Sequence, residues 1–267
     1  MIHVAFIGAG KMASAMVRGL LDRQVFAPGQ IGCTSGNDDT GVKLAALSGI
    51  HYEPDVAQLL RPADIVVLAC KPQQLAALDA SVTTLTHGKL LLSILAGTPL
   101  VKLAGRFPGA RNIVRSMPNT PGQIGAGITA FSPLTPLPPA DQATVENILG
   151  SLGAVLELPE TDIDAVTAVS GSGPAYLFEF TAAFREAAIA TGLKPDVAEK
   201  LVRETVRGAA KLMELTGEDP EKLRDAVTSP GGTTEAALKV LKAANFRKTF
   251  TEAVAAAQRR SLELAKL

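Results

Sequence analysis

The sequence predicts an α/β protein, with a doubly wound parallel sheet in its first part and only helices in its second part. Up to about residue 160, short apolar runs alternate with helical patterns, which is typical of a parallel sheet covered by helices on both faces. Beyond Leu158 the strand signal stops and helical periodicity continues. We therefore expect two domains, residues 1–160 and 161–267, joined near the segment Pro159-Glu160-Thr161-Asp162.

The expected strands are short and apolar, as strands buried on both faces are. They cover residues 2–7, 30–34, 65–69, 90–94, 111–117 and 128–131. Helices are expected over residues 11–23, 73–85 and 141–152. In the second part they are expected over 163–191, 195–216, 221–228, 234–244 and 246–267, with Asp162 as the N-cap of the first.

Composition excludes several classes of function. The 26 basic residues balance the 26 acidic ones, so no overall field favours nucleic acid or an anionic membrane. No apolar run approaches the roughly 20 residues of a membrane span, and the N-terminus lacks the features of a signal peptide. Cys33 and Cys70 fit neither a zinc pattern nor a disulfide framework. We expect a cytoplasmic protein without a metal site.

A glycine-rich segment follows the first expected strand and opens the first expected helix. It reads Gly8-Ala9-Gly10-Lys11-Met12-Ala13 after Ile7 and fits G-x-G-x-x-G/A in the required context. Gly8 permits a tight turn, and Gly10 lets the backbone approach a pyrophosphate at the helix N-terminus. This pattern predicts a Rossmann-type dinucleotide site formed by residues 7–12.

The end of the second strand bears on the choice of coenzyme. NAD sites usually place an acidic residue there, but this chain has Thr34-Ser35-Gly36-Asn37. Hydroxyl and backbone N–H groups can receive a 2′-phosphate, although no Arg is present and Asp38 follows closely. We predict that Thr34 and Ser35 contact the coenzyme, with NADPH preferred and NADH possible.

Two further strand ends are expected at the same edge of the sheet, because ligands bind outside the carboxyl ends of parallel strands. The segments are Ala69-Cys70-Lys71-Pro72 and Ser93-Ile94-Leu95-Ala96-Gly97. The residues predicted to contact the coenzyme there are Ala69, Lys71, Pro72, Ala96 and Gly97.

Three segments are candidates for the substrate site. Met117-Pro118-Asn119-Thr120-Pro121-Gly122 is a rigid loop in which Asn119 can donate or accept. The second segment is Ser229-Pro230-Gly231-Gly232-Thr233-Thr234, in which two glycines leave the backbone free before a helix that we expect a threonine to cap. Unpaired N–H groups at such a helix start form an anion receptor suited to a small carboxylate. The third segment, Gly171-Ser172-Gly173-Pro174, interrupts an apolar helix. It predicts a kink that opens space for a small ring or for the nicotinamide.

The chain lacks several catalytic patterns. Its three histidines, His3, His51 and His87, lie outside these loops, and there is no H-E-x-x-H, G-x-S-x-G or Walker loop. Oxidation of an alcohol usually needs a general base. Hydride transfer to an already polarised C=N bond needs little acid–base help, so reduction of an imine fits these residues better.

The glycine fingerprint, the strand ends and the two second-part motifs occur in an order and spacing that resemble the pyrroline-5-carboxylate reductase family almost end to end. The resemblance implies reduction of 1-pyrroline-5-carboxylate to L-proline with NADPH or NADH, and a C-terminal helical domain that forms an intertwined homodimer or larger oligomer. It implies a substrate carboxylate near Gly231, Gly232 and Thr233. It makes Thr234 the catalytic hydroxyl at the ring nitrogen. Many bacterial relatives carry Arg near Ser35, which this chain lacks.

The full substrate set predicted in this way has members in three segments, namely Asn119, Gly171, Ser172, Gly173, Ser229, Gly231, Gly232, Thr233 and Thr234. Two alternatives stay open. Another β-hydroxyacid-type reductase would need a catalytic Lys in the long helix after the junction, where residues 176–191 hold Arg185 but no Lys. A non-catalytic sensor of nicotinamide nucleotides would explain the glycine fingerprint but not the anion receptor.

Overall fold

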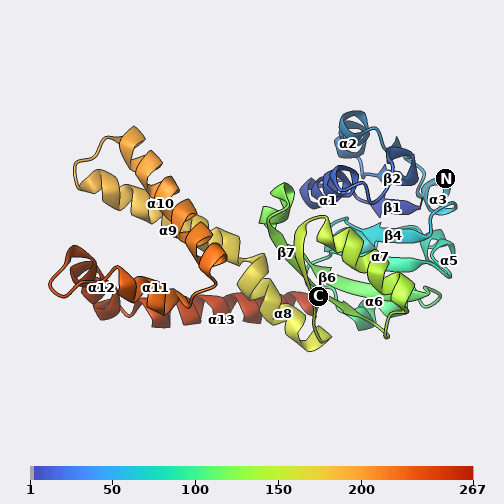
Figure 1. Cartoon of the computed structure of the whole chain (residues 1–267). Coiled ribbons are helices and arrows are strands. Elements are labelled where there is room, and N and C mark those ends of the chain that lie inside the picture. The colour runs from blue at the N-terminus through green and yellow to red at the C-terminus, as the bar shows by residue number, and fades with distance from the viewer. Residues whose placement is uncertain (1–2, 267) are drawn as a thin grey trace. The chain divides into compact units, whose positions relative to one another are not determined.

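The computed structural model describes residues 3–266 and divides into two compact units. The sheet unit holds the chain up to Ser172 and again from Ala257, and the helical unit is Gly173–Ala256. Figure 1 follows the chain through both.

Among the described residues, the sheet unit contains one sheet of eight strands in the order β3-β2-β1-β4-β5-β6-β7-β8. The central β1 pairs in parallel with β2 and β4, so the chain winds outward in both directions from it. The strands are β1 (Val4–Ile7), β2 (Ile31–Thr34), β3 (His51–Tyr52), β4 (Ile65–Leu68), β5 (Leu90–Ser93), β6 (Asn112–Met117), β7 (Gly127–Pro133) and β8 (Gly153–Glu157).

Helices cover both faces of this sheet (Figure 1). Alternate side chains of a strand point to opposite faces, so Val4 and Phe6 enter one core while Ala5 and Ile7 enter the other. The first core is packed by α1 (Lys11–Asp22), α2 (Thr40–Ser48) and α7 (Pro139–Gly150), and the second by α3 (Val56–Leu60), α4 (Pro72–Leu75), α5 (Ser81–Leu85) and α6 (Leu100–Arg106).

One pair of neighbouring strands is antiparallel. β7 runs against β6, with Met117 opposite Ala130, whereas the expected sheet was parallel. The connection between these strands is a short 3₁₀ turn, Thr120–Ile124. A parallel partner needs a crossover of about a dozen residues or more, so this short loop dictates the reversal.

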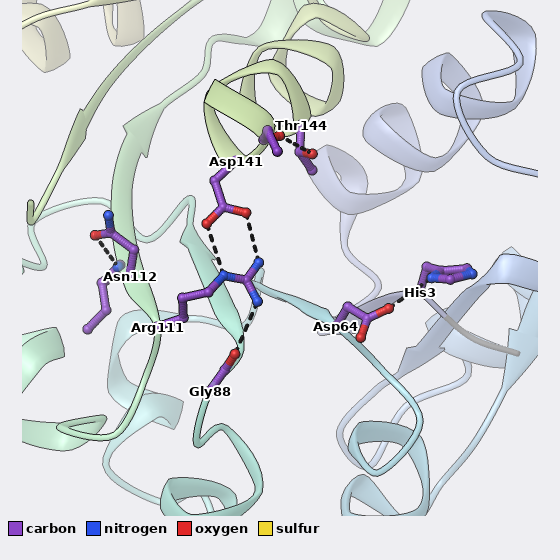
Figure 2. A network of polar contacts seen from close by, with 9 residues as sticks. His3, Asp64, Gly88, Arg111, Asn112, Asp141 and Thr144 are labelled. Carbon is purple, nitrogen blue, oxygen red and sulfur yellow. Dashed lines mark hydrogen bonds and ion pairs between the residues drawn. The ribbon is translucent and has the colours of Figure 1, made fainter. Parts of the chain in front are cut away.

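The amino-terminal edge of the sheet carries a network of polar contacts (Figure 2). Arg111 donates from Nε and Nη2 to the two carboxylate oxygens of Asp141, each at 2.9 Å, and from Nη1 to the Gly88 carbonyl at 3.1 Å. His3 Nδ1 lies 2.9 Å from Asp64 Oδ2. The Arg111 contacts join the starts of β5 and β6 to α7, and the His3–Asp64 contact joins the starts of β1 and β4.

Beyond the sheet, the chain forms α8 (Ile163–Val166), a wide π-type turn (Thr167–Gly171) and then the helical unit. The predicted interruption near Gly171 is therefore present as this wide turn. The remaining helices are α9 (Gly173–Ala190), α10 (Pro195–Thr216), α11 (Pro220–Ala226), α12 (Thr233–Ala243) and α13 (Phe246–Ala265). α9 and α10 lie side by side, and α13 returns to the sheet unit.

Several predicted boundaries need correction. The helix expected over residues 73–85 is two helices, because Asp79 Oδ1 accepts a hydrogen bond from Ser81 N–H at 2.8 Å and starts α5 separately. Asp162 is the N-cap residue of α8, as predicted, but its side chain accepts from the Thr161 hydroxyl and makes no capping hydrogen bond to the helix. Ile2 of the first expected strand and Leu267 of the last expected helix lie outside the described residues. No helix within residues 3–266 is long and apolar enough to cross a membrane.

Candidate active site

The carboxyl ends of the parallel strands stand in register across the sheet. Ile7 pairs with Thr34 on one side and with Leu68 on the other, and Leu68 pairs with Ser93. The loops that follow these strands therefore begin side by side at the carboxyl edge of the sheet. The residues predicted to contact the coenzyme lie at these strand ends, in the loops that follow, and in the first turns of α1 and α4.

Gly8 allows the first of these loops to lie against the next strand. Its φ is +110°, and a Cβ on it would lie 2.5 Å from the carbonyl carbon and oxygen of Ala69. The Gly8 N–H donates to the Thr34 carbonyl at 3.0 Å. Any side chain here would collide with backbone, so this position requires glycine for the fold itself.

Gly10 has a different environment. A Cβ on Gly10 would meet no protein atom within 4 Å, and its φ of −71° is open to any residue. Gly10 precedes α1, whose start receives no side-chain cap and carries no acidic residue in its first turn. The amides at a helix start favour an anion, so the open space and the uncapped donors fit the pyrophosphate of a dinucleotide.

Thr34 ends β2 with a buried hydroxyl. Its Oγ1 makes no hydrogen bond within the described part of the chain, and only 3% of the residue is exposed. A buried polar atom without a partner is rare. Any contact that Thr34 makes with a ligand in this arrangement comes through its backbone or requires the side chain to turn.

The loop after β2 lies beside the loop after β4. A Cβ on Gly36 would be 3.6 Å from Gln74 Nε2. The pKa of Asp38 is held below its usual range, first by hydrogen bonds from Thr40 and, as the smallest cause, by the charge of Lys71. Ser35 Oγ donates to the Asp38 carbonyl at 3.2 Å. The loop after β2 therefore lies against Gln74 in α4, and the Asp38 carboxylate is within electrostatic reach of Lys71.

The loop after β5 is the last of the predicted coenzyme loops along this edge of the sheet. Ala96 is exposed, whereas Gly97 is buried with φ +64°. A Cβ on Gly97 would lie 3.1 Å from Leu264 Cβ in the last turns of α13. Gly97 is therefore needed for a left-handed turn against that helix.

Asn119 and the wide turn meet at the end of β6. A Cβ on Gly171 would lie 2.7 Å from Met117 Cε, so the turn packs on the residue two before Asn119. Asn119 Oδ1 accepts a hydrogen bond from Ile128 N–H at 3.0 Å. Its amide nitrogen donates to no atom of residues 3–266 and remains available. Ser172 Oγ is occupied, since it donates to the Thr167 carbonyl at 3.1 Å.

The expected anion receptor lies in the helical unit. Gly231 has φ +73°, and Gly232 N–H donates to the Ser229 carbonyl at 3.0 Å. The expectation that a threonine caps α12 is wrong, because Gly232 is the N-cap and no side chain caps the helix. Thr233 and Thr234 form its first turn instead, Thr233 exposed and Thr234 half-buried. Their backbone N–H groups and hydroxyls remain at the helix start.

The predicted residues fall into groups by unit. The coenzyme residues come together along the carboxyl edge of the sheet, with Asn119, Gly171 and Ser172 at the end of β6 in the same unit. Gly173 opens the helical unit, which also holds the receptor of Ser229 and residues 231–234.

Glu235 was not predicted as part of the site. Its Oε2 accepts a hydrogen bond from Gly231 N–H at 2.9 Å. The signal was present in the sequence, since a Glu three residues after an N-cap is half of a capping box. With a threonine as the expected N-cap, Glu235 does not fall at the third helical position, so the pattern does not point to it.

These features define a dinucleotide-binding α/β oxidoreductase with an added helical unit. The family described as NADP oxidoreductase, coenzyme F420-dependent, matches residues 3–97. The family described as pyrroline-5-carboxylate reductase dimerisation matches residues 160–264. The pyrroline-5-carboxylate reductase of Synechocystis is 38% identical to this chain over 265 residues, which is 99% of each protein.

Solved structures of pyrroline-5-carboxylate reductases are also similar to this chain. A pyrroline-5-carboxylate reductase from Coxiella burnetii superposes with a TM-score of 0.91 at 36% identity, covering 100% of this chain and 99% of the other. The Plasmodium falciparum enzyme with NADP bound gives 0.86 at 29% identity, covering 99% and 98%. The chain belongs to the pyrroline-5-carboxylate reductase family.

Proposed function

We propose that this protein reduces 1-pyrroline-5-carboxylate to L-proline with a nicotinamide nucleotide, NADPH in preference to NADH. The observation that carries the proposal is the open, uncapped start of α1 at Gly10, in a chain that matches these reductases over its whole length. Membership of this family favours the activity over a hydroxyacid reductase or a non-catalytic sensor.

The coenzyme would be held along the carboxyl edge of the sheet. The amides of residues 8–12 would bind its pyrophosphate, and the loops at Ala69–Pro72 and Ala96–Gly97 would flank its ribose and nicotinamide. When bound, the reduced nucleotide supplies a hydride to the imine carbon. The residues of this chain hold the two reactants in line, and such positioning supplies most of the acceleration.

The substrate carboxylate would bind the amides near Gly231, Gly232 and Thr233. The uncapped helix start leaves the N–H groups of Thr233 and Thr234 as donors and favours a negative charge, whereas the Gly232 N–H is bonded to the Ser229 carbonyl and the Gly231 N–H to Glu235. The half-buried Thr234 hydroxyl would hydrogen-bond the ring nitrogen, and it or water would deliver the proton there. Within the sheet unit, the free amide nitrogen of Asn119 and the wide turn that ends at Gly171 are further candidates for substrate contact.

We further propose that the protein is a homodimer or a larger homo-oligomer. Within the helical unit only Ala198 and Val202 are buried. A groove of about 460 Å³ between α9 and α10 is lined mainly by apolar atoms, including Leu177, Phe178 and Val202. So little buried surface does not stabilise a set of helices alone, and a second copy would cover them. A monomeric mass across the micromolar range would contradict this.

The preference for NADPH rests on the loop after β2. There is no acidic residue at Thr34 or Ser35. The pKa of Asp38 is lowered mainly by hydrogen bonds from Thr40, and the charge of Lys71 is the smallest cause. The variant Ser35→Asp would add a carboxylate where a 2′-phosphate binds and should lower kcat/KM for NADPH more than for NADH. Equal effects on the two coenzymes, or a wild-type preference for NADH, would contradict the preference.

The activity itself is tested by following coenzyme oxidation in the presence and absence of 1-pyrroline-5-carboxylate. We expect oxidation only when the imine is present. The division at residue 160 into a coenzyme domain and a substrate and dimerisation domain, and the cytoplasmic location, stay predictions.

A further inference from the structure

A carboxylate of the protein itself already occupies part of the proposed anion receptor. Glu235 Oε2 accepts a hydrogen bond from the Gly231 N–H at 2.9 Å. The same oxygen lies 3.3 Å from Lys239 Nζ, one turn further along α12. The Glu235 side chain is 35% exposed, so water and ligands can reach it.

The position of Glu235 explains this contact. In a capping box the third residue of the helix binds the N–H of the N-cap. Here the N-cap is Gly232, and its N–H is taken by the Ser229 carbonyl at 3.0 Å. The Glu235 carboxylate therefore reaches one residue further back, to Gly231, whose φ of +73° turns the N–H toward the helix start.

We propose that Glu235 sets the affinity for the substrate by competing with its carboxylate for the Gly231 N–H. This inference rests on the proposed function, because the ligand it concerns is the carboxylate of 1-pyrroline-5-carboxylate or L-proline. Two carboxylates cannot share one N–H donor, and like charges repel at such a distance. Binding of the substrate must displace Glu235, and Lys239 offers the displaced carboxylate a partner on the same helix face.

Competition by Glu235 should affect KM but not kcat. Glu235 leaves the receptor when the substrate binds, so the free energy of displacing it is added equally to the bound ground state and to the transition state. Removing a uniform binding effect changes KM and leaves kcat unchanged. A role for Glu235 only in holding the loop predicts the opposite sign, since loss of the contact would then loosen the receptor and raise KM.

The test compares Glu235→Gln, Glu235→Ala and the wild-type protein in coenzyme oxidation with 1-pyrroline-5-carboxylate, with L-proline added as a competitive inhibitor. Glu235→Ala should lower both KM and the inhibition constant of L-proline about three- to tenfold, the effect of losing one partly exposed charged competitor. Glu235→Gln keeps a neutral acceptor and should give a smaller decrease. In both variants kcat should stay within about twofold of wild type.

Glu221→Gln is the matched control. Glu221 lies in the first turn of α11 and pairs with Arg247 Nη2 at 2.6 Å, so it is also a paired glutamate at a helix start in the same unit. Its KM should not change. Unchanged or raised KM in both Glu235 variants, with an active wild type, would overturn the role of Glu235 and leave the proposed function standing. A wild type that oxidises no coenzyme with this imine would overturn both.

Discussion

The Ser261 hydroxyl donates a hydrogen bond of 2.7 Å to Asp164 Oδ1, joining two residues 97 positions apart in the sequence. Arg115 Nη2 lies 3.2 Å from the same oxygen, and Arg115 Nη1 lies 3.2 Å from Glu160 Oε1. Arg115, Asp164 and Ser261 are all buried. The last turns of α13 are thereby fastened to α8 and to β6 within the sheet unit.

Ser261→Ala should destabilise the protein, because it removes a buried hydrogen bond to a charged group, which contributes about 1.5–3 kcal/mol. The measurement is the midpoint of urea denaturation. Thr251→Ala is the control on the same helix, since the Thr251 hydroxyl is exposed and donates only to the Arg247 carbonyl at 3.0 Å. Equal midpoints for the two variants would mean that the Asp164 contact contributes nothing.

Gly8 and Gly10 should respond differently to alanine. Gly10→Ala should leave the denaturation midpoint unchanged, because its Cβ meets no protein atom, and should weaken NADPH binding by obstructing the pyrophosphate. Gly8→Ala should lower the midpoint as well, because its Cβ would lie 2.5 Å from the Ala69 backbone. Titration with NADPH and urea denaturation of both variants check this pair. Normal NADPH affinity in Gly10→Ala would place the dinucleotide elsewhere.

Thr234→Ala should lower kcat about tenfold to a hundredfold, as expected for losing one hydrogen bond that strengthens in the transition state. Coenzyme affinity should remain near that of wild type. Thr233→Ala should have less effect, because its backbone N–H, which is proposed to bind the carboxylate, survives. Steady-state kinetics of both variants measure the difference. Small and equal effects would show that neither hydroxyl takes part in the reaction.

Acid should weaken the fold partly through Asp55. Its carboxylate accepts from the N–H groups of Ala57 and Gln58 at the start of α3, and its pKa is lowered, mainly by the Ala57 contact. A lowered folded pKa adds stability above the unfolded value of about 3.9, and this stability is lost as the pH falls through the folded pKa.

Asp55→Asn keeps a capping oxygen but cannot ionise, so its urea midpoint should fall less than that of wild type between pH 7 and pH 3. Asp22→Asn is the control, because Asp22 accepts no hydrogen bond from residues 3–266. A parallel loss of stability in Asp55→Asn and wild type would contradict the role of this carboxylate.

Much of the sheet was predictable because its central strands are continuous apolar runs that end in glycine or a turn. The edge strands β3 and β8 were missed for the opposite reason. β3 is the two-residue pair His51–Tyr52, and the side chains of Ala154 and Leu156 in β8 are exposed, so neither carries a buried pattern. The short helices α2, α3 and α6 give too few turns for a clear periodicity.

The candidate site was predictable where a local rule applies. Gly8 is fixed by its left-handed turn and Gly10 by its place at the start of α1. The Asn119 contact with Ile128 and the packing of Gly171 on Met117 depend on tertiary contacts. The same holds for Arg115, whose two carboxylate partners come from residues 45 and 49 positions away. No local pattern encodes such pairs.

The most direct test measures NADPH consumed and L-proline formed in the same reaction with 1-pyrroline-5-carboxylate and this protein. We predict that one L-proline forms for each NADPH oxidised, that no oxidation occurs without the imine, and that kcat/KM is higher with NADPH than with NADH. Tight binding of NADPH with no formation of L-proline would contradict the proposed reaction.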